Sequence, residues 1–158
     1  MSEKPVSPVP SKVLMIATYI SGGIGAYFGF NALNGSGGLT LAAILAMGVP
    51  GILSFIRHAI FNRSDAVNGG WDYGAVNNFQ IEVGLANLAW GVFAILAVAL
   101  DWGQTAIAAS FLISGFYFAA VALFIVIARD FKDRKILGFI GITVWAIVTI
   151  WIGLGLMA

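Results

Sequence analysis

The sequence predicts an all-α integral membrane protein built as a bundle of five transmembrane helices. Of its 158 residues, 60% are hydrophobic and only 9% are charged, and the mean hydropathy is +0.96. Soluble domains carry roughly 25% charged residues, so the composition indicates the membrane class. A helix needs roughly 20 apolar residues to cross a hydrocarbon core of about 30 Å. Five stretches meet this length, at residues 13–33, 39–61, 79–100, 105–128 and 136–157.

A proline-rich segment precedes the first stretch. Residues 1–12 hold three of the four prolines, and proline disfavours helix in the residue before it. We therefore expect residues 1–12 to form a disordered cytoplasmic tail and residues 13–157 to form a single transmembrane helical domain. The first stretch is long, and residues 31–34 at its end make a poor small-residue cleavage site, so we expect a retained helix and not a signal peptide.

Small residues and one proline mark the first two stretches. Gly25 and Gly29 have the spacing of a close helix-packing face. Pro50 lies near the middle of the second stretch, between Gly48 and Gly51. Because proline removes a backbone donor and clashes with the preceding turn, we expect a kink there.

Basic residues predict the orientation of the bundle. Five crossings place residues 1–12, 62–78 and 129–135 on one side of the membrane, and all eight Lys and Arg residues lie on or next to that side. The positive-inside rule then places the N-terminus in the cytoplasm and the C-terminus outside. We expect the basic loop at 129–135 to help set this topology and to contact anionic headgroups.

The net charge and the amino-acid composition exclude several classes of function. A formal charge of +1 leaves no basic excess for nucleic-acid phosphates, so we expect no nucleic-acid partner. The absence of cysteine excludes thiolate chemistry and cysteine-ligated metal clusters. His58 is the only histidine and hence the only candidate metal ligand of that kind; a second imidazole has to come from another chain. The sequence indicates no cofactor.

Polar residues at the inner ends of the second and third stretches form the first candidate site. Arg57 and Glu82 lie at matching depth, on the order of 5 Å inside the cytoplasmic boundary. An unpaired charge there costs a few kcal/mol, so we expect an Arg57–Glu82 ion pair completed by His58 or Gln80. The alternatives are that Arg57 reaches the headgroups while Glu82 faces water, or that these four residues form a functional site.

A second candidate is a polar patch near mid-membrane. An antiparallel hairpin brings Asn87 and Tyr117 to the same depth, and Ser110, Ser114 and Tyr117 share one helix face. Polar groups in hydrocarbon need internal partners, so we expect hydrogen bonds between the helices here. The patch either holds the helices together or forms the polar wall of a small cavity.

One segment, at about residues 54–91, resembles small bacterial multi-pass membrane proteins of an uncharacterised family. The residues that carry the resemblance are Phe55, Arg57, His58, Trp71, Phe79, Gln80, Glu82, Val83, Gly84, Ala86, Asn87 and Leu88. The resemblance implies a bacterial inner-membrane setting and a shared role for Arg57, His58, Gln80, Glu82 and Asn87. It implies no activity.

Three interpretations of function follow. The first is a non-catalytic membrane protein that packs against itself or serves as an accessory subunit of a larger membrane complex, with the lipid bilayer as its surroundings. The second is a small proton-linked transporter that uses Glu82 and His58. The third is a haem- or metal-binding subunit that uses His58 within an oligomer. An enzyme is less favoured, because no nucleophile, base and orienting residue occur at a recognisable spacing.

Overall fold

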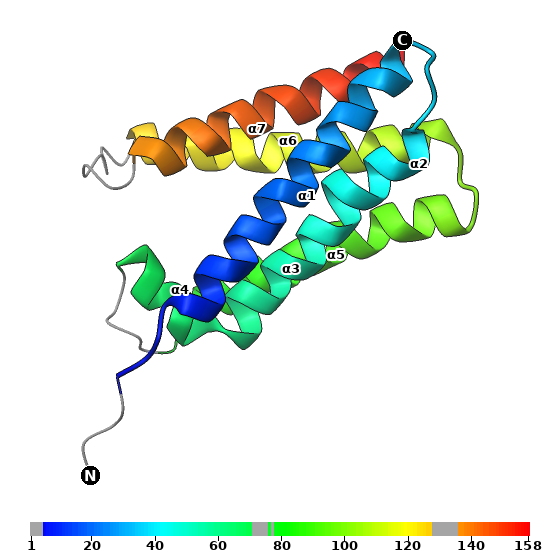
Figure 1. Cartoon of the computed structure of the whole chain (residues 1–158). Coiled ribbons are helices and arrows are strands. Elements are labelled where there is room, and N and C mark those ends of the chain that lie inside the picture. The colour runs from blue at the N-terminus through cyan, green and yellow to red at the C-terminus, as the bar shows by residue number, and fades with distance from the viewer. Residues whose placement is uncertain (1–4, 71–75, 77, 128–135) are drawn as a thin grey trace.

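The computed structural model describes residues 5–70, 76, 78–127 and 136–158, and all regular structure in these residues is helical (Figure 1). Five helical stretches are long and apolar enough to cross a membrane, which confirms the predicted fold class. They are α1 (Val9–Leu33), a composite second stretch (Leu39–Ile60), α5 (Asn78–Ala99), α6 (Gln104–Ile127) and α7 (Ile136–Gly155). The basic loop expected at 129–135 and Trp71 lie outside the described residues.

The first helix begins four residues earlier than expected. Helix α1 starts at Val9, so residues 9–12 belong to the helix and not to the tail. Pro10 sits in the first turn, where the backbone N–H that proline lacks has no partner inside the helix. As a result Ser11 is fully buried in the first turn of α1.

The second stretch departs from α-helical geometry twice. It consists of α2 (Leu39–Ala42), the π-helical turn η1 (Ala43–Gly48), α3 (Val49–Phe55) and a second π-helical turn, η2 (Ile56–Ile60). The expected break at Pro50 takes the form of η1, where the N–H of Val49 bonds the carbonyl of Ile44, five residues back. Pro50 has no backbone N–H, so in a regular α-helix one carbonyl of the preceding turn would have no donor. The wider π-helical turn ends two residues before this position.

Glycines bring the helices into close contact, as expected for Gly25 and Gly29. A Cβ on Gly25 would overlap the backbone of Ala46 in η1, and a Cβ on Gly29 would lie 2.7 Å from Ile152 of α7. The first helix therefore packs on two neighbours through one glycine face. Gly51 of α3 approaches Gly91 of α5 equally closely, because a Cβ on Gly51 would lie 2.6 Å from the Gly91 Cα.

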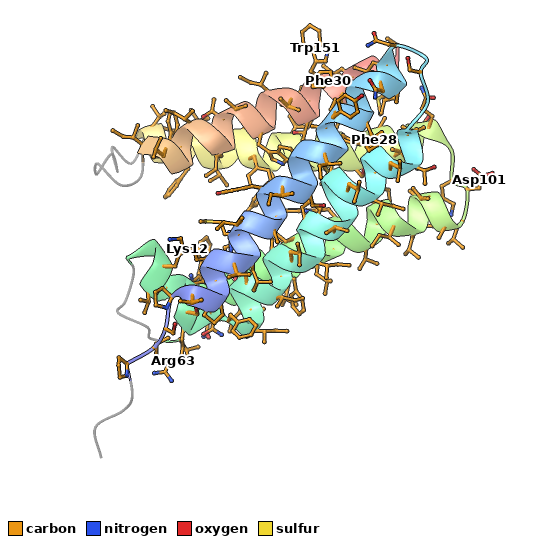
Figure 2. All side chains as sticks on the ribbon, in the orientation of Figure 1. Lys12, Phe28, Phe30, Arg63, Asp101 and Trp151 are labelled. Atoms are coloured by element: carbon orange, nitrogen blue, oxygen red, sulfur yellow. The ribbon has the colours of Figure 1, made fainter. Side chains whose placement is uncertain are left out.

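The two ends of the bundle differ in character. The short helix α4 (Asn62–Gly69) packs beside the start of α1, whereas the C-terminus lies at the opposite end, near the end of α1 (Figure 1). Lys12 and Arg63 lie at the α4 end, and Asp101 lies at the other (Figure 2). The start of α1 and the C-terminus thus lie at opposite ends of the bundle, as an odd number of crossings such as five requires.

The apolar core occupies the half of the bundle remote from α4. Its largest fully buried side chains are Met47 of η1, Phe111 of α6 and Ile152 of α7, surrounded mainly by alanines. Each of these three residues lies within nine residues of the helix end that faces away from α4. At the α4 end, polar side chains instead join the helices, and these side chains form the candidate site.

Candidate functional site

A buried carboxylate, Asp65, is the centre of the polar site at the α4 end. Asp65 is only 5% exposed. Its Oδ1 accepts a hydrogen bond from the Ser11 hydroxyl at 2.6 Å, and its Oδ2 lies 2.7 Å from His58 Nδ1 and 3.1 Å from the Gln80 amide nitrogen. Arg57 Nε lies 3.3 Å from Oδ1. We call Ser11, Arg57, His58, Asp65 and Gln80 the Asp65 cluster.

The contacts of Arg57 determine which ring nitrogen of His58 carries the proton. Arg57 Nη2 lies 2.6 Å from His58 Nε2. A guanidinium group can only donate hydrogen bonds, so Nε2 must accept and carries no hydrogen. The ring proton is then on Nδ1, from which it is donated to Asp65. In this arrangement His58 is neutral, and the cluster holds one negative charge on Asp65 and one positive charge on Arg57.

The members of the cluster come from four helical elements. Ser11 comes from the first turn of α1, Arg57 and His58 from η2, and Gln80 from the third position of α5. Asp65 lies in the first turn of α4, where a negative charge interacts favourably with the helix dipole. The cluster therefore joins four helical elements through one carboxylate.

A second contact fastens the start of α1 to α4. The backbone N–H of Ser11 donates to the hydroxyl of Ser64 at 3.1 Å, and both residues are buried. The first N–H groups of a helix have no partner within the helix, so Ser64 satisfies one of these donors. The α1 terminus is thus held by Ser64 as well as by Asp65.

The electrostatics of the cluster keep Asp65 ionised. Burial by itself raises the pKa of Asp65, but the hydrogen bond from His58 and the positive charge of Arg57 outweigh it. The net effect holds the pKa of Asp65 below its ordinary value of 3.8. At neutral pH the group is therefore a carboxylate, which accepts hydrogen bonds from Ser11, His58 and Gln80 and forms an ion pair with Arg57.

Two polar atoms of the cluster remain without a hydrogen bond. Gln80 Oε1 and Arg57 Nε are buried and have no hydrogen-bond partner in the described part of the chain. Arg57 Nε is close enough to Asp65 for an ion pair, but it does not meet the geometry of a hydrogen bond. The Gln80 amide donates to Asp65 through its nitrogen, which leaves its oxygen as an unused acceptor. Such a group costs about 1–3 kcal/mol, so the network is incompletely satisfied.

The predicted ion pair between Arg57 and Glu82 does not form, and Asp65 takes the place of Glu82. Glu82 is exposed and makes no ion pair with any described residue. It follows Gln80 by two positions and so points to another side of α5. Residues 62–69 form the helix α4 where the sequence predicts a connection between two spans, and this helix brings Asp65 back to the membrane end. Three of the four expected cluster residues, Arg57, His58 and Gln80, do come together.

The expected mid-membrane patch is not joined by hydrogen bonds from Asn87 or Ser110 to the opposite helix. Asn87 donates to the Val83 carbonyl of its own helix at 2.6 Å, and Ser110 donates to the Ile107 carbonyl of its own helix at 2.7 Å. Both residues are buried. Back-bonding of this kind satisfies short polar side chains without a partner on another helix.

The remaining members of that patch pack tightly. Ser114 is 2% exposed, and the Tyr117 ring lies 4.8 Å from the Trp90 ring of α5 between centroids. The contact between α5 and α6 at this depth is therefore aromatic. On α5, Asn87 instead shares its side with Gly91, which approaches Gly51 of α3.

His58 remains the candidate metal ligand, but both of its ring nitrogens are already occupied. Nδ1 contacts Asp65 and Nε2 contacts Arg57. A metal ion or haem iron would have to displace one of these two partners. Within the described residues, no group of three or more His, Cys, Asp or Glu side chains is placed to hold a metal ion.

The fold and the cluster together define a multi-pass helical membrane protein with a buried carboxylate, imidazole and guanidinium at one end. Residues 36–158 match the family of unknown function DUF6790, and the chain belongs to that family. The matched region contains all members of the Asp65 cluster except Ser11. Searches of curated proteins and of solved structures give no match. The expectation of a family of unknown function is thus confirmed, whereas the specific sequence pattern and the bacterial origin stay predictions.

Proposed function

We propose that this protein is a non-catalytic accessory subunit of a membrane complex, in which the Asp65 cluster locks the helices at one end. The observation that carries the proposal is the state of Asp65. Both of its oxygens are occupied by donors from α1, η2 and α5. A carboxylate held in this way stabilises an arrangement of helices and is not free to act on a substrate.

The proposed location is the bacterial inner membrane, with the α4 end in the cytoplasm. The charges support this orientation, because Lys12 and Arg63 lie at the α4 end (Figure 2). Positive residues are retained on the cytoplasmic side during insertion. Helices that lie in the bilayer meet other membrane proteins mainly through their lipid-facing sides. Another subunit or a second copy of the chain is the partner we propose.

Isolation of the assembly tests this function. The tagged chain is extracted from native membranes in mild detergent, and the particle mass and subunit composition are measured together with an absorption spectrum. We expect a discrete particle larger than one chain, with a partner or further copies at fixed stoichiometry. Asp65→Asn should dissociate it, whereas the control Glu82→Gln should leave it intact. A monodisperse single chain under these conditions would contradict the proposal.

Proton-linked transport is the second candidate, and the contact between His58 and Asp65 favours it. A carboxylate and an imidazole that are hydrogen-bonded at 2.7 Å can exchange a proton. In membrane pumps and transporters, ionisable groups of these kinds form proton relays. In this form Asp65 replaces Glu82 as the carboxylate. Proteoliposomes loaded with a pH-sensitive dye provide the test: proton flux that Asp65→Asn abolishes and Glu82→Gln preserves would establish transport, and no flux would exclude it.

The third candidate, a haem- or metal-binding subunit, has less support from the site. His58 can serve as a ligand only after it releases Arg57 or Asp65. The absorption spectrum and metal content of the purified assembly test it directly. A Soret band or a stoichiometric metal that disappears in His58→Gln would favour this function over the structural one.

A further inference from the structure

We propose that the Asp65 cluster is a proton-operated switch, in which protonation of His58 expels Arg57 and makes the imidazolium the new counter-ion of Asp65. The switch is a property of the cluster itself, and it does not depend on whether the protein has partners. It goes beyond the structural role above, because it gives the cluster two states.

The contact between Arg57 and His58 exists only while His58 is neutral. Arg57 Nη2 lies 2.6 Å from His58 Nε2, and arginine has no acceptor. A proton taken from solvent onto Nε2 turns that atom into a donor. Two donors then face each other at hydrogen-bond distance, and two positive charges share one site. Both effects act against the contact, so the guanidinium must move away.

The contact between His58 and Asp65 survives the same protonation. Nδ1 already donates to Asp65 at 2.7 Å, and this hydrogen bond gains charge assistance when the ring becomes positive. Asp65 thus exchanges one cation for another and remains compensated. With Arg57 still in place the cluster would carry a net positive charge, whereas its departure restores neutrality.

Arg57 is placed to leave, and His58 is placed to receive a proton. Their side chains are 15% and 12% exposed, compared with 7% for Asp65. Both residues lie at the last turn of the second stretch, from which a long arginine side chain can extend to the headgroups. The carboxylate stays inside while the two basic groups have a route to the surface.

Gln80 provides an acceptor that the present arrangement does not use. Gln80 is 2% exposed, and its Oε1 has no partner among the described residues. Its amide nitrogen and His58 Nδ1 bond the same carboxylate oxygen, so the two side chains are neighbours. A newly protonated Nε2, or the moving guanidinium, can satisfy this oxygen after a local side-chain rotation.

No other described titratable group faces His58. From α4 the ring meets Asp65, and from its own turn it meets Arg57. On α5, Gln80 bonds the same carboxylate oxygen as His58, and Gly84 lies beside the His58 Cβ; neither residue has a titratable side chain. The other charged residues on the described parts of these elements and of α1 are exposed; they are Lys12, Arg63 and Glu82.

The single histidine makes the test direct. The full chain, with ¹⁵N-labelled histidine and arginine, is placed in lipid nanodiscs and followed by NMR as the pH is lowered. The Arg57 side-chain signal is assigned from its absence in Arg57→Lys. His58→Gln is the control, because glutamine can donate to Asp65 and accept from Arg57 but does not take up the proton.

The switch predicts three results. At alkaline pH the histidine carries its hydrogen on Nδ1 and none on Nε2. As His58 protonates, the Arg57 signal moves toward those of the exposed arginines with the same midpoint. In His58→Gln the Arg57 signal does not move over that pH range.

Each opposite result overturns the proposal. These results are a hydrogen on Nε2 at alkaline pH, an Arg57 signal that stays fixed while His58 protonates, equal movement in His58→Gln, or a histidine that never protonates before the chain unfolds. If His58→Gln fails to fold, the tautomer and the shared midpoint in the unaltered chain still decide the matter. Neither readout depends on isolating a complex, so failure of the switch is distinguishable from failure of the proposed function.

Discussion

Replacing Asp65 by asparagine should be the most destabilising single change at the α4 end. The substitution keeps the size of the side chain, but it removes the charge that compensates Arg57 and places an amide donor among existing donors. Breaking a buried ion pair on one side costs about 3–5 kcal/mol. The Arg57 side chain is 15% exposed and can move toward the headgroups, which recovers part of this loss. We therefore expect the lower end, about 3 kcal/mol.

The assay is reversible unfolding in a mixed detergent or bicelle system, with the free energy of unfolding obtained by linear extrapolation. Glu82→Gln serves as the matched control, since Glu82 is an exposed acid near the start of α5 with no ion pair to a described residue. Its effect should stay within about 0.5 kcal/mol. A double-mutant cycle between Asp65→Asn and Arg57→Met should give a coupling energy of about 0.5–3 kcal/mol. An Asp65→Asn loss below about 1 kcal/mol, or an equal loss in Glu82→Gln, would refute the reasoning.

Three further predictions concern single interactions. Ser11→Ala removes the 2.6 Å hydrogen bond to Asp65 and should lower the free energy of unfolding by about 1.5–3 kcal/mol in the same assay. Gly51→Ala places a Cβ 2.6 Å from the Asn87 carbonyl and should cost about 1–3 kcal/mol, whereas Gly141→Ala, with nothing within 4 Å, should be neutral or slightly stabilising; equal effects would contradict the packing argument. Because the folded pKa of Asp65 lies below 3.8, its contribution to the free energy of unfolding should be complete above that pH and be lost only as the pH falls further. The measurement is the free energy of unfolding of Asp65→Asn and of the unaltered chain as a function of pH. A difference between the two that vanishes well above pH 3.8 would show that the sign is wrong.

The helices were predictable because a bilayer imposes a simple length rule. The five observed stretches begin and end within a few residues of the expected ones, since hydropathy alone decides which segments can lie in hydrocarbon. The largest difference is the start of α1 at Val9. A proline-rich segment was expected to be unstructured, but proline in the first helical turn costs little.

The cluster was only partly predictable, because its centre lies outside the spans. Arg57, His58 and Gln80 stood out as polar groups at the ends of apolar stretches. Asp65 did not, since a charged residue in a short connection is ordinarily solvated. The signal that could have identified α4 is an acidic residue a few positions after the last apolar residue of a span, where a new helix can begin with the charge in its first turn. Ser11 required knowing that α1 starts early.

The π-helical turn η2 explains how two consecutive residues reach the same carboxylate. Side chains of neighbouring residues diverge by about a quarter of a turn or more in a regular helix, so Arg57 and His58 would ordinarily point to different neighbours. In η2 the Phe61 N–H bonds the Ile56 carbonyl, five residues back, so the turn holds one more residue than an α-turn. That wider turn lets both side chains contact Asp65, at 3.3 Å and 2.7 Å. Since π-turns are less favourable than α-turns and occur mostly at functional sites, the contacts of Asp65 and the geometry of η2 stabilise each other. Release of Arg57 on protonation of His58 would remove one of those contacts, and the switch would thereby act on the helix that carries it.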